Sequence, residues 1–262
     1  MNALALAYAG FTLVYPDIVG GTFGENHFSK VRTQQMETYM MRNAQWAALH
    51  SSMGMGEPPW SFSPKVACVM LVAAKLHARF AQDGYPWTMI PIAYPDDDMA
   101  YGRENATDRG YEWQIGDTML AVPLYGNDYA SAESRDVYLP KGQWMDFDTG
   151  KLFAGGQTLK AFPLPVGKTL LFIGGSGVTL EDLRGVVTAV VYPVAAKVSA
   201  ILTLPDSPEV ITINIQGLGA GLKWHTIHVA DSHGNAAKVK VEGFGFGFVP
   251  KSGETYTVHA VR

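Results

Sequence analysis

Asp17 is the acidic residue of this chain whose setting best suits it to contact a ligand. It follows a short apolar segment, residues 12–16, and is followed by Gly20 and Gly21. An acidic side chain at the carboxyl end of a strand, with glycines that let the backbone pass close to a ligand, is typical of the catalytic face of an α/β barrel. Its carboxylate could accept hydrogen bonds from ligand hydroxyls. The alternative is an aspartate that caps the following helix or loop.

Trp60 is the second candidate ligand-contacting residue. Pro58 and Pro59 precede it and hold the chain in an extended loop. An indole in such a loop can stack on the face of a sugar ring, and the alternative is a tryptophan that packs inside the barrel. The residues alone favour neither role over the other.

Three further clusters of polar or glycine residues predict neither a metal site nor a cofactor. Residues 96–98 are three aspartates after a predicted strand, but no matched His or Glu accompanies them, so we interpret them as a solvated loop. His225 and His228 lie three residues apart in a predicted strand and therefore point to opposite faces. Residues 174–177 (GGSG) lack the Lys and Ser/Thr of a phosphate-binding loop. We predict no metal and no cofactor.

Composition narrows the classes of partner. The chain has 262 residues, 47% of them hydrophobic, and a net charge of −4 with scattered basic residues, which gives no reason to expect nucleic acid. No apolar run approaches the roughly 18 residues that span a bilayer, so we predict no membrane partner. The single cysteine, Cys68, lies in an apolar stretch and is predicted to be buried. It has no second cysteine to pair with, so cysteine usage points to no compartment.

The pattern of elements changes twice along the chain. Residues 1–110 alternate apolar strands with helices. Residues 111–180 contain only strands and turns. Residues 181–262 contain evenly spaced, alternating strands, which is the pattern of a β-sandwich.

Individual elements can also be predicted. Helices are expected at residues 34–49, from apolar positions recurring every three or four residues, and at residues 64–82, which begin at a proline. Residues 87–94 are predicted to be a barrel strand. In residues 243–248 phenylalanine alternates with glycine, which favours a packed sandwich strand over a carbohydrate platform. Strands are predicted in the last region at residues 186–192, 210–215, 225–229 and 255–261.

The most specific sequence motifs of the chain lie in residues 111–152. Residues 116–123 read GDTMLAVP, and residues 137–150 read VYLPKGQWMDFDTG. Both blocks resemble the segment that follows the catalytic barrel in glycoside hydrolase family 31, the second of them without a gap. The resemblance implies a fold that is α/β plus all-β: the C-terminal portion of a TIM (β/α)8 barrel, followed by proximal and distal β-sandwich domains. The corresponding domains are residues 1–110, 111–180 and 181–262.

The resemblance extends into the first region. Residues 16–21 (PDIVGG) are similar to a strand end of the subgroup that includes the myogenesis-regulating glycosidase, and Arg42, Gln45 and Trp60 match that subgroup's spacing. By position, the resemblance implies that Asp17 contacts the sugar next to the scissile bond. Gly54 and Gly56 stand where typical members have an Arg and a His that grip the sugar, a pair that this subgroup also lacks.

The resemblance also implies a reaction. A retaining glycosidase needs two carboxylates about 5–5.5 Å apart. In the family both lie on strands before the segment that matches Asp17, and the 16 residues before Asp17 contain no acidic residue. We therefore expect the catalytic pair to lie outside this chain, which would act on an oligosaccharide or glycoside only together with the remaining N-terminal part of the barrel. The alternative hypotheses are a non-catalytic carbohydrate-binding or interaction protein, and a fragment without activity of its own.

Overall fold

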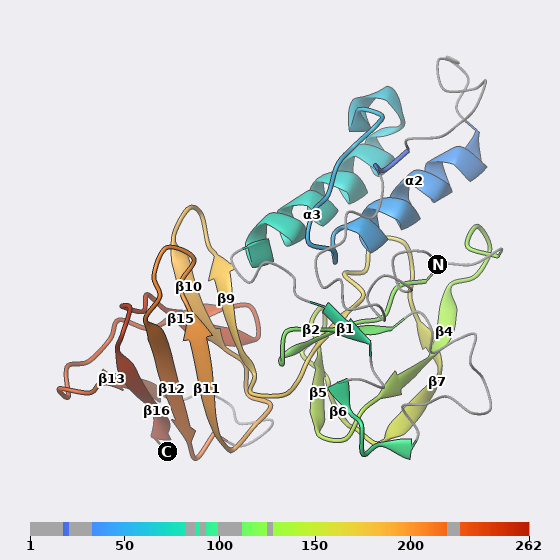
Figure 1. Ribbon diagram of the computed structural model, residues 1–262. Coiled ribbons are helices and arrows are strands. Elements are labelled where there is room, and N and C mark those ends of the chain that lie inside the picture. The colour runs from blue at the N-terminus through green and yellow to red at the C-terminus, as the bar shows by residue number, and fades with distance from the viewer. Residues whose placement is uncertain are drawn as a thin grey trace.

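The computed structural model describes residues 18–20, 33–81, 87–89, 93–98, 112–124, 128–218 and 226–261. Asp17 and His225, both named above, lie outside the described residues. Among the described elements, the helices α2 and α3 come before the strands (Figure 1). No helix within the described ranges is long and apolar enough to cross a membrane.

The two predicted helices are confirmed as α2, Gln34–Ala47, and α3, Pro64–Phe80. Helix α2 begins where the Thr33 side chain accepts a hydrogen bond from the Met36 amide at 3.2 Å, which satisfies one of the free N–H groups of the first turn. Helix α3 begins with Pro64, whose missing N–H costs nothing at that position. The helices pack against each other through apolar side chains at three- and four-residue spacing.

Strands of the middle region form a six-stranded sheet and a separate two-stranded ribbon, and every pair in them is antiparallel. The sheet has the order β1 (Trp87–Met89), β2 (Trp113–Ile115), β3 (Met119–Ala121), β8 (Leu171–Ile173), β5 (Gln143–Asp146) and β6 (Leu152–Ala154). The ribbon pairs β4 (Ser134–Leu139) with β7 (Gln157–Pro163). This β-unit and the two helices share one hydrophobic core.

The prediction of a barrel strand at residues 87–94 is wrong. Strand β1 covers Trp87–Met89 and pairs antiparallel with β2, whereas neighbouring strands of a TIM barrel run parallel. An apolar run specifies burial but not the direction of its partner, which explains the error.

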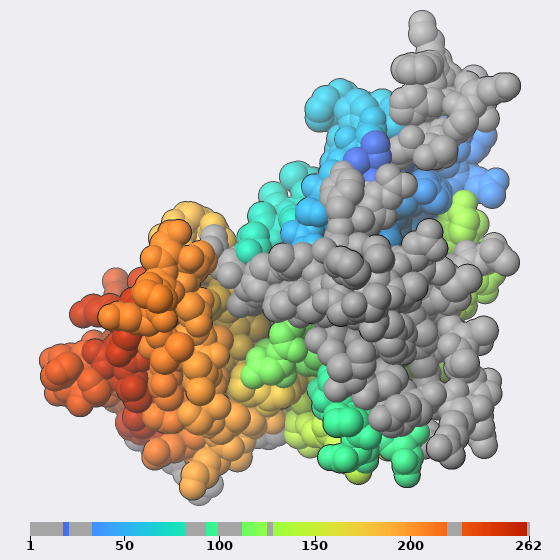
Figure 2. Space-filling view, viewed as in Figure 1, coloured from blue at the N-terminus to red at the C-terminus, as the bar shows by residue number. Residues whose placement is uncertain are grey.

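The last region forms a β-sandwich, as predicted. One sheet has the order β14 (Lys240–Glu242), β15 (Gly245–Phe248), β10 (Val187–Val191) and β9 (Val178–Asp182). The other has the order β11 (Lys197–Thr203), β12 (Val210–Gln216), β16 (Thr255–Val261) and β13 (Thr226–Asp231). Their facing side chains, among them Leu180, Val191, Ile213 and Phe246, form a second core. Figure 2 shows this sandwich, orange to red, as a lobe beside the helices and the first β-unit.

The alternating glycines and phenylalanines of β15 are confirmed as a packed strand. Phe246 and Phe248 are 2% and 1% exposed and point into the sandwich core. The glycines face the other way, and a Cβ on Gly247 would lie 2.7 Å from the Thr188 side chain. The phenylalanine rings therefore lie inside the sandwich, and the strand offers no aromatic platform.

Two predictions about burial are wrong. Cys68 is exposed, because the face of α3 that carries it, together with Leu71 and Val72, lies opposite the buried stripe. Nearly every position of this helix is apolar, so the sequence alone could not show which side meets the core. Asp97 is buried rather than solvated and accepts a hydrogen bond from the Tyr138 hydroxyl, although Asp96 and Asp98 are exposed as predicted.

The described fold is therefore mostly β-sheet, and it agrees with the β-sandwich part of the predicted fold. In the region predicted to be barrel, the described residues comprise two helices, a short 3-10 turn, one isolated parallel bridge and the antiparallel strand β1. That is less than a barrel.

Candidate functional site

The segment that follows Asp17 is held against the loop that leads to Trp60. Val19 forms an isolated parallel bridge with Met55. Its amide donates to the Gly54 carbonyl at 2.8 Å, and its carbonyl accepts from the Gly56 amide at 2.9 Å. Both backbone polar groups of the buried Val19 are thus satisfied, which fixes residues 18–20 beside this loop.

Gly20 allows this segment to turn over helix α2. Its φ of +74° is in the left-handed region, and an added Cβ would lie 2.5 Å from the Met40 sulfur in the core. A side chain here would meet both backbone strain and a collision. The first of the two glycines after Asp17 therefore has a steric role in the described structure.

Gly54 and Gly56 stand at the two positions where the resemblance expected a sugar-gripping Arg and His. They supply the carbonyl and the amide that hold Val19. Without side chains they add no charge to the site, so any ligand here is contacted by other groups.

Trp60 lies in the short 3-10 turn η2, Pro59–Ser61, directly after this loop. Pro58 is extended, with φ −69° and ψ 136°, and its carbonyl accepts from the Ser61 hydroxyl at 2.8 Å. The turn is thus fixed by its own backbone, while the indole is 81% exposed. Its exposed face is open to a ring-shaped ligand, and it does not pack in the core as the alternative interpretation required.

Glu57 is a carboxylate at this site that the sequence analysis did not single out. It is 6% exposed, and its Cβ is the neighbour that an added Gly20 Cβ would meet at 3.4 Å. The sequence signal was weak, because one acidic residue before two prolines is compatible with any loop. The site thus combines residues 18–20, the loop of residues 54–57 and Trp60, with Asp17 outside the described residues.

Arg42 and Gln45, which matched the family's spacing, have structural contacts. Arg42 donates to the Leu164 carbonyl at 2.6 Å and to the Ala132 carbonyl at 3.1 Å. Gln45 donates to the Lys168 carbonyl at 2.6 Å. Both side chains are buried, so they fasten helix α2 to the first β-unit and thereby help to position the loop that α2 leads into.

His50 lies between helix α2 and this loop, but its environment does not suit proton transfer at neutral pH. Burial lowers its pKa to about 4, and its Nδ1 lies 3.0 Å from the Trp46 carbonyl. Its ring packs between Trp46 and Trp113, with centroids 4.2 and 4.9 Å away. The imidazole is therefore a neutral core group above about pH 5.

Asp231, His233 and Glu254 come together with ligand atoms within 4.8 Å of one another, which the sequence did not predict. Their hydrogen bonds are local: Asp231 accepts from the His233 and Asn235 amides, and Glu254 accepts from Ser232. These contacts stabilise a turn, and we assign no metal to it. His228 is exposed and stacks on His259 at 5.5 Å across the pair β13–β16.

Comparison with known proteins identifies the first β-unit. Residues 87–178 match the Glycosyl hydrolase family 31 C-terminal domain. They contain strands β1 to β8, which are the six-stranded sheet and the ribbon that packs with it.

Two curated relatives cover more of the chain. The SITS-binding protein of Tetronarce californica is 25% identical over 182 residues, which are 66% of this chain and 25% of that protein. The myogenesis-regulating glycosidase of Mus musculus is 28% identical over 160 residues, which are 57% of this chain and 22% of that protein. The chain spans about a quarter of the length of these relatives.

Among solved structures, the cycloalternan-forming enzyme from Listeria monocytogenes in complex with pentasaccharide substrate matches with a TM-score of 0.52. The match covers 92% of this chain and 23% of that one at 12% identity, so it shows a shared fold. Together with the matched domain, these comparisons confirm the resemblance found in residues 111–152. Residues 87–178 therefore carry the C-terminal domain of glycosyl hydrolase family 31.

Proposed function

We propose that this chain is the C-terminal part of a retaining glycosidase that hydrolyses terminal α-linked sugars. The observation that carries the proposal is the parallel bridge between Val19 and Met55, with helix α2 between them. A strand, a helix and a second strand parallel to the first are the repeating unit of a (β/α)8 barrel. This unit precedes the matched family domain along the chain, with helix α3 between them, which supports a barrel whose C-terminal part includes residues 18–56.

Asp17 and Trp60 are the residues that we propose contact the sugar. In the sequence Asp17 is two residues before Val19, and Val19 is bonded to Gly54 and Gly56. Its carboxylate would accept hydrogen bonds from sugar hydroxyls, and the exposed indole of Trp60 would stack on a sugar ring. The two groups would thus contribute binding and orientation rather than bond cleavage.

The bond-breaking carboxylates are proposed to lie outside this chain. In double displacement, one carboxylate attacks the anomeric carbon while a second, about 5–5.5 Å away, protonates the leaving group. The resemblance puts both on barrel strands before Asp17. The chain alone is therefore expected to release no nitrophenol from aryl α-glycosides, and release by the purified chain above a no-protein blank would overturn this proposal.

A second candidate function is sugar binding or protein interaction without catalysis. It is favoured by one relative, which is named a binding protein rather than a glycosidase. Calorimetry with a panel of neutral α-linked sugars separates the two candidates. Binding that is abolished in Asp17→Asn and retained in Asp206→Asn, an exposed aspartate of the sandwich, supports the first. Binding that is unaffected by Asp17→Asn supports the second.

A further inference from the structure

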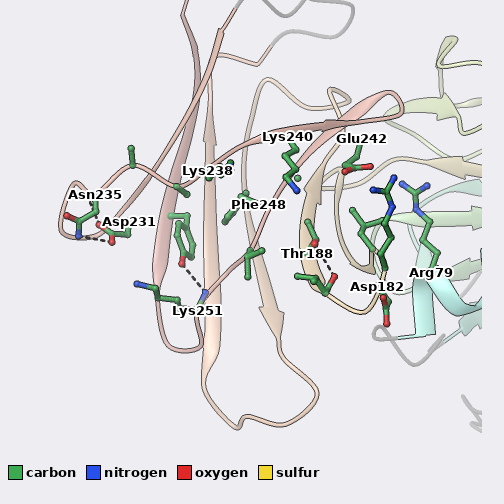
Figure 3. A pocket seen from close by; sticks show the side chains of 18 of the residues that line it. Arg79, Asp182, Thr188, Asp231, Asn235, Lys238, Lys240, Glu242, Phe248 and Lys251 are labelled. Carbon is green, nitrogen blue, oxygen red and sulfur yellow. Dashed lines mark hydrogen bonds between the residues drawn. The ribbon is translucent and has the colours of Figure 1, made fainter.

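A cavity lies away from the candidate site. It is found where the end of helix α3 meets the outer face of the sheet β14–β15–β10–β9 (Figure 3). Its volume is about 860 Å³. Neither Trp60 nor residues 18–20 line it. Its walls come from α3, the β9–β10 hairpin and residues 235–251, which are far apart in the sequence.

Strand β15 contributes Gly247 and Phe248 to the lining of this groove. Gly245 and Gly247 face outward from the sandwich, opposite Glu242 and Lys240 in the register of β14. Because Gly247 has no side chain, β15 adds only backbone to the groove at that position, next to the Thr188 side chain. In Figure 3, Lys240 stands between Arg79 at one end of the groove and Lys251 at the other.

Positive charge dominates the lining. The three acidic side chains are Asp182, Asp231 and Glu242. The six cationic side chains are Lys75, Arg79, Arg184, Lys238, Lys240 and Lys251. Arg79 is paired with Glu181, which lies outside the lining, so five cations remain against three carboxylates, an excess of two positive charges. The chain as a whole has a net charge of −4, so positive charge is concentrated locally at this groove.

Two of the three acidic side chains of the lining already accept hydrogen bonds from backbone amides. Asp231 accepts from two amides of its own turn, and Asp182 accepts from the Gly185 amide at 2.6 Å. Of the cations, Arg79 pairs with Glu181. Within the described part of the chain, the other five cations make no ion pair with another residue. Unpaired cations around a concave surface favour a ligand that carries several negative charges.

The lining also narrows the class of anion. Its two aromatic residues, Phe248 and Tyr256, are 1% and 3% exposed, so they offer no ring on which a nucleobase could stack. A concave site does not match the flat surface of a membrane. Because residues 87–178 match a glycosyl hydrolase domain, we propose that the groove binds an anionic oligosaccharide, one whose sugar units carry sulfate or carboxylate groups. The inference goes beyond the proposed function, because this binding needs neither Asp17 nor catalysis.

The experiment measures binding of a heparin-derived hexasaccharide to the full chain by calorimetry at low salt. The test variant is Lys238→Glu/Lys240→Glu. The matched control is Lys141→Glu/Lys197→Glu, which makes the same change of charge at exposed lysines outside the groove. The test variant should weaken binding at least about tenfold and the control less than about twofold, and added NaCl should weaken binding to the unmodified chain. Lys251→Glu, at the other end of the groove, is a second test should the double variant not fold.

Four results would overturn the proposal. They are no binding of the hexasaccharide, an equal loss in the test and control variants, equally tight binding of neutral isomaltohexaose, and equally tight binding of oligo-dT or poly-glutamate. The last result would mean that the groove selects charge and not a sugar chain.

Discussion

Arg79 and Glu181 join the helices to the sandwich. The Arg79 Nε lies 2.5 Å from Glu181 Oε2, at the end of α3 where the helix meets β9 (Figure 1). Glu181 is fully buried and also accepts from the Tyr192 hydroxyl and the Thr179 hydroxyl, both at 2.7 Å. The buried carboxylate thus has partners for both oxygens, and its charge is balanced by the arginine.

Arg79→Met should destabilise the protein by about 3–5 kcal/mol, because it leaves a buried carboxylate without its counter-charge. The matched control is Arg184→Met, an exposed arginine of the neighbouring hairpin that makes no ion pair with a described residue, and its cost should be under about 0.5 kcal/mol. The measurement is urea unfolding of both variants and of the unmodified chain. Equal costs would show that the buried pair is not what joins these elements.

His50 should make stability depend on pH. Burial lowers its pKa from 6.5 to about 4, so the unfolded chain binds a proton in the pH range where the folded chain does not. The stabilisation is therefore complete above about pH 6.5 and is lost as the pH falls to about 4, by about 3 kcal/mol in total. Burial lowers the pKa of His77 too, which acts in the same direction.

Unfolding in urea at a series of pH values between 4 and 8 checks this. In His50→Phe the loss of stability on acidification should be smaller than in the unmodified chain. An identical pH profile in His50→Phe and the unmodified chain would contradict the prediction.

Gly175→Ala should destabilise the protein by more than about 2 kcal/mol. Gly175 has φ +56°, and an added Cβ would lie 1.9 Å from the Asp117 carbonyl oxygen, which is backbone and cannot move aside. Gly116 has φ +57°, but a Cβ added to it would meet no atom within 4 Å. Gly116→Ala should therefore show the effect of backbone strain alone, a destabilisation of about 1 kcal/mol. Thermal unfolding of the two variants separates collision from strain, and equal shifts would refute the collision.

Trp60→Ala should leave stability within about 0.5 kcal/mol of the unmodified chain, because the indole is 81% exposed. Trp144→Ala is the contrast: that indole is 1% exposed and donates to the Pro140 carbonyl at 2.7 Å, so its loss should cost about 3–5 kcal/mol. Chemical unfolding measures both. A large loss of stability in Trp60→Ala would favour a packing role over a sugar contact.

The spacing of apolar residues predicted much of the fold, because it shows which face of each helix or strand is buried. Strand β16 was predicted at residues 255–261 and is observed at Thr255–Val261, since its alternating pattern has one face in the sandwich core. Helix α3 was predicted, but not the side on which Cys68 lies, because an apolar helix has no clear polar face. The direction of β1 was also wrong, because it depends on pairing with β2, a segment more than 20 residues away.

The sites were harder to predict, because their residues meet only in the folded chain. Asp17 and Trp60 were proposed as site residues from the family resemblance and from their residue types, and their contact with sugar stays a prediction. The contact of Val19 with residues 54–56 was not predicted, since it consists of backbone hydrogen bonds, which do not depend on particular side chains. The cationic groove draws on residues from Lys75 to Lys251, and its basic residues are scattered along the chain, so no local pattern reveals it.

The most direct test of the central claim, that sugar binds beside Asp17 and Trp60, is hydrogen–deuterium exchange of the chain with and without saturating maltose. The account predicts slower exchange in peptides that cover residues 18–20 and 54–61, including the Val19 and Gly56 amides that bond this segment to the loop. Slower exchange confined to the sandwich strands of residues 178–261, or no change anywhere, would contradict it.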